Sequence, residues 1–324
     1  MKRRVFVQSA AAWVAAAAVA PGARAQDPFP SKPIRFIVPT AAGSATDAVG
    51  RAYGERMAKV LKQPVIVEPM PGAGTLLAMR HMLKAPPDGY TLCISANTLV
   101  TLPYVDKSAG FTPGDFAGVS NFAVSPMALV VGADSPYKTL NDLVAAAKRS
   151  PGALSFASVG VGTTSHLPVE LFAQSAGIRM ELIPYKGIPL AIPDVASGRV
   201  TLMMGTSASA GELVKAGKLR ALAVTSERRT PSFPGVPTFA ELGHEEASYE
   251  LFLGLVGVTK VPMPIRRQVA EAADEARKDP ELRRRLEALG FDMPTQTTPE
   301  LFDAFLAREA GKMQKVVKAA NIQA

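Results

Sequence analysis

The sequence has little of the chemistry that binds metals, forms disulfides or crosses membranes. It contains one cysteine and three histidines, and His81, His166 and His244 lack the spacing of metal ligands. Cys93 stands in the apolar run Thr91–Ile94, which predicts a buried core residue and no reactive thiol. Internal apolar runs fall short of the ~20 residues that a membrane-spanning helix needs. We therefore expect no disulfide, no metal site and no transmembrane helix.

Motifs of catalysis and nucleotide binding are missing as well. There is no G-x-S-x-G elbow, and Ser165 and His166 are sequence neighbours, which does not place one to activate the other. The glycine-containing stretch Pro71–Thr75 is not followed by the Gly-Lys-Ser/Thr of a phosphate-binding loop. The sequence therefore predicts a protein that is not an enzyme and has no cofactor.

The first 25 residues read as an export signal. Lys2-Arg3-Arg4 forms a basic start, an Ala- and Val-rich stretch follows, and Ala23-Arg24-Ala25 is a cleavage site before Gln26. The run Arg3–Val7 also resembles a twin-arginine signal, so the twin-arginine and general secretory routes both stay open. No cysteine follows the cleavage site, which argues against a lipid anchor. We expect a soluble periplasmic protein, cleaved after Ala25.

The net charge of +8 overstates how basic the mature protein is. The signal carries four of the 36 basic residues and none of the 28 acidic ones, which leaves 32 against 28 and a net charge of +4. No arginine-rich face with interleaved aromatic residues is present, so nucleic acid is not an expected partner. We also expect a monomer.

Short apolar runs alternate with helical patterns along the mature chain, which predicts an α/β protein with mostly parallel sheets. About 299 residues are enough for two cores of ordinary domain size. The expected strands are 34–38, 65–67, 91–95, 128–131, 154–157, 180–183, 200–204, 220–224 and 251–256. The expected helices are 45–61, 75–84, 139–148, 166–176, 188–196, 209–216, 237–242, 264–278, 280–289 and 298–319, the last with an apolar packing face that includes Leu301 and Phe302.

Two segments share one layout, in which an apolar strand ends at a Gly/Ser/Thr loop that opens into a helix. The first is Ile37–Gln63 and the second is Ser155–Gln174. Ser44 is expected to cap the first helix, and Ser165 could cap the second. A helix start has unpaired N–H groups and a partial positive charge, so it suits an anion. Ligands of open α/β sheets lie beyond the carboxyl ends of strands, where both loops belong.

Each loop taken alone also fits ordinary helix capping. Two such loops in two halves of one exported chain favour a ligand cleft between domains. Asp47 would repel a bound anion, so its carboxylate either caps the helix or accepts from a ligand hydroxyl, amine or water. His166 is expected in the first turn of its helix, near the mouth of the cleft.

Further stretches, found in order along almost the whole mature chain, carry a resemblance to a known family. They are Pro30–Arg35, Val38–Gly43 with Thr46-Asp47, Gln63–Glu68, Pro71–Gly74, Pro87–Leu92, Gly160–Thr163 with His166-Leu167, Pro184–Gly187, Ala216–Thr225 and Val236–Thr238. On these residues the chain resembles the Bug family of periplasmic solute-binding proteins, the receptors associated with tripartite tricarboxylate transporters.

The resemblance implies a two-lobed Venus-flytrap fold, of the type II periplasmic-binding-protein class, that closes on a small organic carboxylate. Lobe 1 would comprise residues 26–127 and 250–324, and lobe 2 residues 128–249. Backbone amides, hydroxyls and ordered waters of the two loops would hold the carboxylate without a dedicated arginine. The implied binding residues are Thr40, Ala41, Gly43, Ser44, Thr46 and Asp47, then Gly160, Gly162, Thr163, Thr164, Ser165 and His166, with Tyr185 at the edge of lobe 2.

The chain departs from the usual family pattern at several positions that bear on the ligand. Thr40 replaces a frequent aromatic residue, Val161 a frequent Asn, Gly205 a polar or acidic residue, Phe252 a frequent Trp, and Pro69-Met70 the usual Asn-Arg. These changes remove side-chain donors and predict a less polar distal pocket. The expected ligand is a monocarboxylate or an aromatic carboxylate, and not citrate.

Two roles for such a receptor stay open from the sequence. The ligand-loaded protein would either deliver the carboxylate to a membrane permease, which is the interpretation we favour, or dock on a sensor protein and signal. An enzyme acting on the carboxylate is the third possibility, and the missing catalytic motifs argue against it.

Overall fold

A computed structural model describes residues 28–295 and 297–319 of the chain. The predicted signal and its cleavage site after Ala25 lie outside the described residues. Residues Lys32–Ala324 form one compact unit, whose architecture over the described residues is as follows. Within the described residues, every helix is too short or too polar to cross a membrane.

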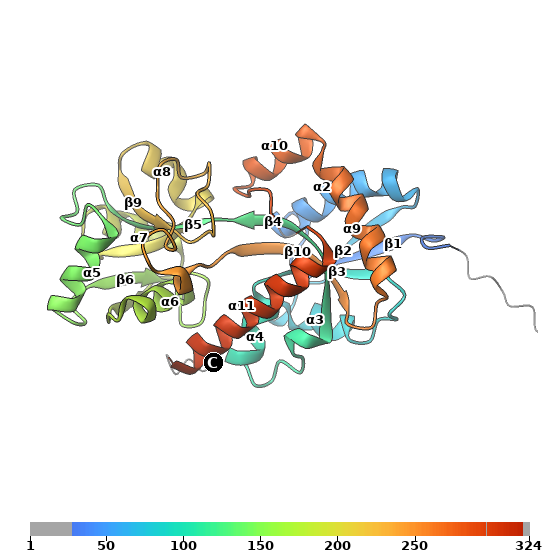
Figure 1. The fold of residues 1–324 in the computed structure, drawn as a ribbon, viewed down its shortest axis with the longest axis horizontal. Coiled ribbons are helices and arrows are strands. Elements are labelled where there is room, and N and C mark those ends of the chain that lie inside the picture. Colours follow the sequence, from blue (N-terminus) through green and yellow to red (C-terminus); the bar gives the residue numbers. More distant parts are fainter. Residues whose placement is uncertain (1–27, 296, 320–324) are drawn as a thin grey trace, which may run out of the picture. The chain divides into compact units, whose positions relative to one another are not determined.

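The first sheet has five strands in the order β2-β1-β3-β10-β4 (Figure 1). Their bounds are β1 Ile34–Val38, β2 Val65–Pro69, β3 Thr91–Ala96, β4 Phe116–Ser125 and β10 Leu251–Val258. β1 runs parallel to β2 and β3, whereas β10 is antiparallel to both of its neighbours. Four strands therefore share one direction. Only β10, which follows the second sheet in the chain, runs the opposite way.

The second sheet repeats this plan in the order β7-β6-β8-β5-β9. Its strands are β5 Met127–Gly132, β6 Ser155–Ser158, β7 Glu181–Pro184, β8 Leu202–Thr206 and β9 Leu219–Val224. β6 is parallel to β7 and β8, and β5 is antiparallel to β8 and β9. Two mixed sheets flanked by helices confirm the predicted two-lobed α/β fold class.

Helices α2, α3, α4, α9, α10 and α11 accompany the first sheet, and α5, α6, α7 and α8 the second (Figure 1). Their bounds are α2 Ala45–Leu61, α3 Leu76–Met82, α4 Thr98–Val105, α5 Leu140–Arg149, α6 Leu167–Ala176, α7 Ile188–Ala196, α8 Glu212–Lys215, α9 Met263–Arg277, α10 Pro280–Ala288 and α11 Pro299–Ala319. Short turns complete the chain at η1 Ala73–Thr75, η2 Pro113–Asp115, η3 Ser207–Gly211 and η4 Glu245–Ala247.

The strand register shows where the two predicted binding loops lie. Each loop is at the end of its sheet that the crossovers connect to the other sheet. Ala96 at the end of β3 lies opposite Leu253 near the start of β10. β1 is parallel to β3, so its carboxyl end lies at this same edge. In the second sheet, Met127 at the start of β5 lies opposite Thr206 at the end of β8, and β6 runs parallel to β8. The loops after β1 and β6 therefore follow strands that end where the chain crosses between the sheets, at Pro126 and through residues 225–250.

The packing face predicted for the last helix is real. Phe302 and Phe305 of α11 are buried and contact Phe252 of β10 edge to face. Gly254 makes room for this contact, because a Cβ at that position would lie 2.1 Å from Cζ of Phe302. Leu301 was expected in the same stripe but is 53% exposed, so that part of the prediction is wrong.

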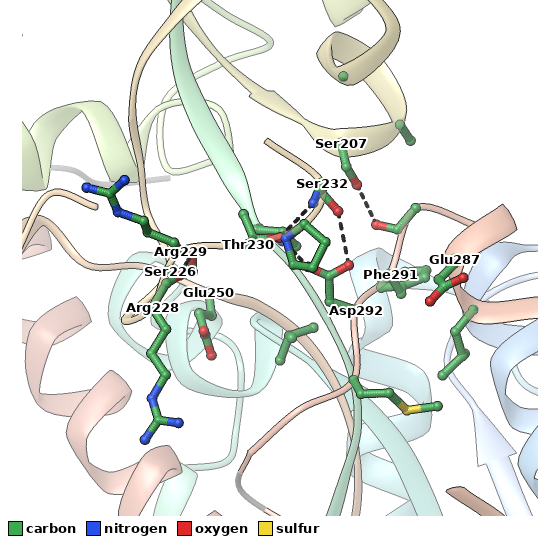
Figure 2. Close-up of a pocket in the computed structure, with 18 of the residues that line it drawn as sticks. Ser207, Ser226, Arg228, Arg229, Thr230, Ser232, Glu250, Glu287, Phe291 and Asp292 are labelled. Atoms are coloured by element: carbon green, nitrogen blue, oxygen red, sulfur yellow. Dashed lines mark hydrogen bonds between the residues drawn. The ribbon is translucent and has the colours of Figure 1, made fainter. Parts of the chain in front are cut away.

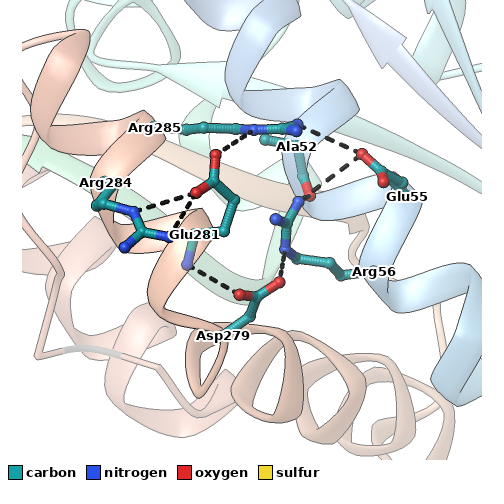
Figure 3. Close-up of polar contacts among 7 residues, drawn as sticks. All are labelled: Ala52, Glu55, Arg56, Asp279, Glu281, Arg284 and Arg285. Atoms are coloured by element: carbon teal, nitrogen blue, oxygen red, sulfur yellow. Dashed lines mark hydrogen bonds and ion pairs between the residues drawn. The ribbon is translucent and has the colours of Figure 1, made fainter.

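An ion network joins α2 to α10 (Figure 3). Asp279 caps α10 by accepting from the N–H of Glu281 at 2.8 Å. Its second oxygen accepts from Nε of Arg56 at 2.5 Å, and the Arg56 side chain is only 9% exposed. Arg285 reaches Glu281 and Glu55 on the outer side of the same contact. The helix that begins at the first loop is thus tied to the C-terminal helices.

Two predicted helices need correction, and two further elements were not predicted. No helix forms at 237–242, because Thr238 pairs beside Val224 of β9 and Gly243, with φ +85°, ends the following turns. Residues 209–216 form the π turn η3 followed by the single-turn helix α8. The strand β4 and the helix α4 were not predicted, and β4 is buried along its whole length.

Candidate functional site

The first loop joins β1 to α2 as the sequence predicts. Ser44 is the N-cap of α2, and its Oγ accepts from the N–H of Asp47 at 3.2 Å. Thr40 Oγ1 lies 2.7 Å from Ser44 Oγ. One of these two hydroxyls donates to the other, and Ser44 Oγ also accepts the N–H of Asp47. The hydrogen of the second hydroxyl has no acceptor in this pair, so the loop can donate it to a ligand.

Asp47 is an internal support of this loop. Its Oδ2 accepts from the N–H of Gly43 at 2.9 Å and from Nε of Arg51 at 2.9 Å. The ion pair with Arg51 holds the pKa of Asp47 below its usual range, and the Gly43 hydrogen bond adds to this against the effect of burial. The residue is 3% exposed, and Oδ1 has no partner among the described residues. The Gly43 N–H and the Nε–H of Arg51 are therefore both committed to Asp47.

The second loop, between β6 and α6, is built on three hydroxyls. Ser158, Thr163 and Ser165 lie within 3.0–3.3 Å of one another. Ser158 and Thr163 both donate to the carbonyl oxygen of Gly160, and Ser165 Oγ accepts from the N–H of Val159. All three hydroxyl hydrogens find acceptors inside the cluster. The predicted capping role of Ser165 is wrong, because α6 begins at Leu167 and Ser165 holds the end of β6 instead.

His166 is also an internal part of the second loop. Its Nδ1 accepts from the N–H of Gly162 at 3.1 Å, so in this arrangement the ring proton resides on Nε2. Nε2 lies 3.4 Å from Oε1 of Glu170, and the ring stacks on Phe156 at 5.9 Å between centroids. The residue is 5% exposed. This histidine orients the loop, and its Nδ1 is not open to a ligand.

The two loops share one construction. In each, a glycine with positive φ donates its N–H to the side chain four residues later, Gly43 to Asp47 and Gly162 to His166. Both glycines need that backbone conformation, which other residues adopt at a cost. Each side chain stands at or beside the start of a helix, and each fixes the loop before it.

The remaining predicted residues vary in exposure, and each lies with the other predicted residues of its own loop. Thr40, Thr46, Gly160 and Tyr185 are half-buried, whereas Ala41 and Thr164 are exposed. The Tyr185 hydroxyl donates to Asp194 at 2.6 Å, which raises the pKa of Tyr185, and the Tyr185 N–H bonds to the carbonyl of Ser158. No hydrogen bond among the described residues joins the first loop to the second.

Several apolar side chains are exposed near the second loop. Val161 is 60% exposed and Val159 40%, and Leu190 at the start of α7 is 61% exposed. These residues follow the carboxyl ends of β6 and β7, at the same edge as the loop's hydroxyls. An apolar surface thus adjoins a polar, glycine-rich turn.

A cavity of about 840 Å³ lies elsewhere, beside the crossover (Figure 2). Its lining comes from 207–215, 226–232 and 283–295, together with Val124, Pro126 and Glu250. None of the predicted binding residues is among the described residues that line it. Sequence reasoning did not find it, because its walls come from segments far apart in the chain that share no motif.

The described residues give no support for a metal centre. They contain no cluster of three or more His, Cys, Asp or Glu side chains that could hold a metal ion. Cys93 is fully buried, and burial raises the pKa of its thiol far above the ordinary value.

The sequence is similar to known proteins along most of its length. The model of a family described as the tripartite tricarboxylate transporter family receptor matches residues 49–322. A UPF0065 protein of Cupriavidus necator, from the gbd 5′ region, is 37% identical over 325 residues and is covered to 98%, as is this chain.

Solved structures share the fold. A TctC solute-binding protein from Polaromonas, without ligand, superposes with a TM-score of 0.83 at 28% identity, covering 90% of this chain and 99% of its own. MatC from Rhodopseudomonas palustris, with bound malate, has a TM-score of 0.65 at 27% identity and covers 89% of this chain and 100% of its own. A further R. palustris protein, with adipate, has a TM-score of 0.67 at 26% identity and covers 90% and 98%.

Proposed function

Because the chain belongs to the family of tripartite tricarboxylate transporter receptors, which are periplasmic solute-binding proteins, we propose that it captures a small organic carboxylate and delivers it to a membrane permease. Residues 40–47 and 160–166 form the proposed binding loops. The observation that carries this proposal is their shared construction, with a glycine fixed by the side chain four residues on, at the sheet edges that the crossovers join.

The donors available in the loops suit a carboxylate. The N–H groups of Ala45 and Thr46, in the first turn of α2, make no hydrogen bond within the described part of the chain. The same holds for Val161 and Thr164 in the second loop. The Thr40–Ser44 pair adds one hydroxyl hydrogen. Unpaired amides at a helix start stabilise an anion without an arginine, and Arg51 is already paired with Asp47.

The ligand we propose carries an apolar body behind its carboxylate. The exposed Val159, Val161 and Leu190 beside the second loop support this. The related R. palustris structures hold malate and adipate, which are both carboxylates. We propose a monocarboxylate or an aromatic carboxylate as the ligand, with citrate excluded.

Capture would proceed by closure of two lobes, residues 26–127 with 250–324 and residues 128–249. The separate sheets and their crossovers at Pro126 and residues 225–250 support these boundaries. A ligand drives closure only through contacts that one arrangement makes and the other lacks. The carboxylate would therefore touch both loops.

A thermal-shift screen of the mature chain, residues 26–324, tests the proposal. The panel contains benzoate- and nicotinate-type acids, monocarboxylates, dicarboxylates, citrate and amino acids, each applied to refolded, ligand-stripped protein. A ligand at a hundred times its Kd stabilises by about 2.7 kcal/mol, which raises the Tm measurably. Stabilisation by apolar carboxylates and recovery of the unchanged acid support a receptor. Tight binding of citrate alone contradicts the ligand class, and a product of turnover contradicts the receptor.

A further inference from the structure

We propose that residues Gly290–Asp292 form a latch that holds the two lobes in the open arrangement and so sets the ligand affinity. The inference rests on the proposed lobe closure, and its test needs no ligand. The latch residues touch neither binding loop, so they would be positioning residues that act through the arrangement of the lobes.

The latch consists of hydrogen bonds at the crossover (Figure 2). Asp292 accepts from the hydroxyls of Thr230 and of Ser232, the latter at 3.0 Å. The carbonyl oxygen of Gly290 accepts from Ser207 Oγ at 2.7 Å and from Ser125 Oγ at 3.0 Å.

The latch segment belongs to the first sheet. Asp292 and Val124, near the end of β4, exchange two backbone hydrogen bonds of 2.7 and 3.1 Å. Gly290 and Phe291 follow α10 directly and bond back to Glu287 and Leu286. The segment therefore moves with β4 and α10.

The hydroxyls that the latch holds belong to the second sheet. Ser207 follows β8 directly. Thr230 and Ser232 precede Phe233, which is 1% exposed and packs in the core of the second sheet with Val130 and Met203. The bonds from Ser207, Thr230 and Ser232 to the latch therefore join one lobe to the other.

Strand order places the Asp292 bonds of the latch on the opposite side of the crossovers from the binding loops, whereas Ser207 follows β8, which lies between β5 and β6. In the first sheet, β4 is an edge strand, and β10 and β3 separate it from β1. In the second sheet, β9 is an edge strand, and β5 and β8 separate it from β6. The latch lies along the outer side of β4 and reaches the segment that follows β9. The binding loops follow β1 and β6.

A rotation about the crossovers that brings the two loops together must draw the β4 and β9 edges apart. Closure therefore lengthens the latch bonds, and ligand binding has to break them. The latch segment and the second lobe also pack closely, because a Cβ on Gly290 would lie 2.9 Å from the Cβ of Ala208.

The test measures the distance between two spin labels in ligand-free protein. Leu77→Cys on α3 and Leu190→Cys on α7 carry the labels, since their side chains are 52% and 61% exposed. These helices follow β2 and β7, the strands farthest from the latch, so closure moves them most. Cys93 is fully buried and does not compete for the label.

The variant Ser207→Ala/Ser232→Ala removes two latch bonds. Loss of one neutral hydrogen bond and one to the Asp292 carboxylate shifts the ratio of closed to open molecules by roughly tenfold or more, so a population at shorter label distance is expected to grow. Ser207→Thr/Ser232→Thr keeps both hydroxyls and should restore the long distance. Ser197→Ala is the control, because its hydroxyl donates to the backbone carbonyl oxygen of Asp194 within the second lobe.

The outcomes are distinct. A gain of the short distance in the alanine variant, reversed by threonine, supports the latch. An unchanged or longer distance in a folded alanine variant overturns it. Failure of the carboxylate screen would leave this distance measurement valid, so the two proposals fail separately.

Discussion

Glu250 is a carboxylate at the second crossover with acidic neighbours on both sides. Its backbone carbonyl accepts from the side chain of Asn97 at 2.8 Å. Glu309 of α11 is 2% exposed and pairs with Lys312 at 3.1 Å, and Glu227 pairs with Arg308 at 2.5 Å. Burial, and then the charges of Glu227 and Glu309, raise the pKa of Glu250 to about 7, although Arg308 opposes the shift.

This shift predicts that Glu250 lowers the stability of the protein as the pH rises from about 4.5 to 7. In that range the folded state holds the Glu250 proton and the unfolded state has released it, so the free energy of unfolding falls with pH. The loss reaches at most roughly 3 kcal/mol and levels off above the folded pKa. Urea unfolding at a series of pH values, compared between the native chain and Glu250→Gln, measures it.

The comparison with Glu250→Gln is needed because His244 acts in the opposite direction. Burial lowers the pKa of His244, so its contribution is lost as the pH falls below the ordinary histidine value of 6.5. The difference between the two stability curves cancels this effect. Glu246→Gln, at an exposed position, controls for the loss of one negative charge. A difference curve with no slope between pH 4.5 and 7 would refute the prediction.

At the binding loops, Ser44→Ala and Thr163→Ala are each expected to weaken carboxylate binding. Ser44 caps α2 and shares the free hydroxyl hydrogen with Thr40, whereas Thr163 fixes the carbonyl of Gly160. The loss of one neutral hydrogen bond costs roughly 0.5–1.5 kcal/mol, or about a two- to twelvefold rise in Kd. Calorimetry with the acid that stabilises the protein most strongly measures the change.

A matched control exists for the capping effect. Thr139 caps α5 with the same hydrogen bond that Ser44 makes, and it lies outside both loops. Thr139→Ala should reduce the Tm and leave the Kd unchanged. If neither loop variant alters the Kd, the proposed placement of the site is wrong.

At the scale of elements, Asp279 holds α10 and α2 together. We expect Asp279→Ala to lower the free energy of unfolding, because it removes a helix cap and leaves the buried Arg56 without its strongest partner. Arg56 would keep the carbonyl oxygen of Ala52 at 3.1 Å and Glu55 at 3.8 Å. Urea unfolding at neutral pH measures the loss.

Asp279→Asn separates the two contributions. The asparagine keeps a side-chain oxygen for the N–H of Glu281 but loses the charge that faces Arg56. Its effect should lie between the native chain and the alanine variant. An alanine variant as stable as the native chain would show that the contact in Figure 3 contributes nothing.

Elements whose signals are local could be predicted from the sequence. β1 and α2 have the predicted bounds, because an apolar run ends at a glycine-containing loop with Ser44 as the cap. β4 escaped prediction because Gly118, Ser120 and Asn121 interrupt its apolar pattern. Ser120 is accepted in the interior because its hydroxyl donates to the carbonyl of Thr297 and accepts from Arg277.

The sites differ in the same way. Contacts between residues close in the sequence could be predicted, and contacts between distant segments could not. The bond from Gly43 to Asp47 spans four residues, so sequence neighbours could suggest the loop. The latch joins Ser207, Thr230, Ser232 and Asp292, whose proximity depends on the packing of both sheets. No local pattern marks residues of that kind.

At the scale of the whole molecule, one hydrophobic cluster runs through both sheets. It includes Ile37 and Phe252 of the first sheet, Leu129 and Phe156 of the second, and Phe305 of α11. A second cluster, around Val130 and Phe233, is confined to the second sheet. A shared core of this kind couples the stability of the two lobes, although the lobes would rotate as separate bodies during closure.

We therefore expect both lobes to unfold in one cooperative transition. The only tryptophan, Trp13, lies in the predicted signal, so a tryptophan placed in the mature chain reports on its own lobe. Tyr104→Trp in the first lobe and Tyr137→Trp in the second suit this purpose, because both side chains pack at the rim of the shared cluster. The two urea curves should have the same midpoint and slope, as two-state unfolding requires. Midpoints that differ would show that the second lobe's own cluster is sufficient and that the crossovers transmit little stability between the lobes.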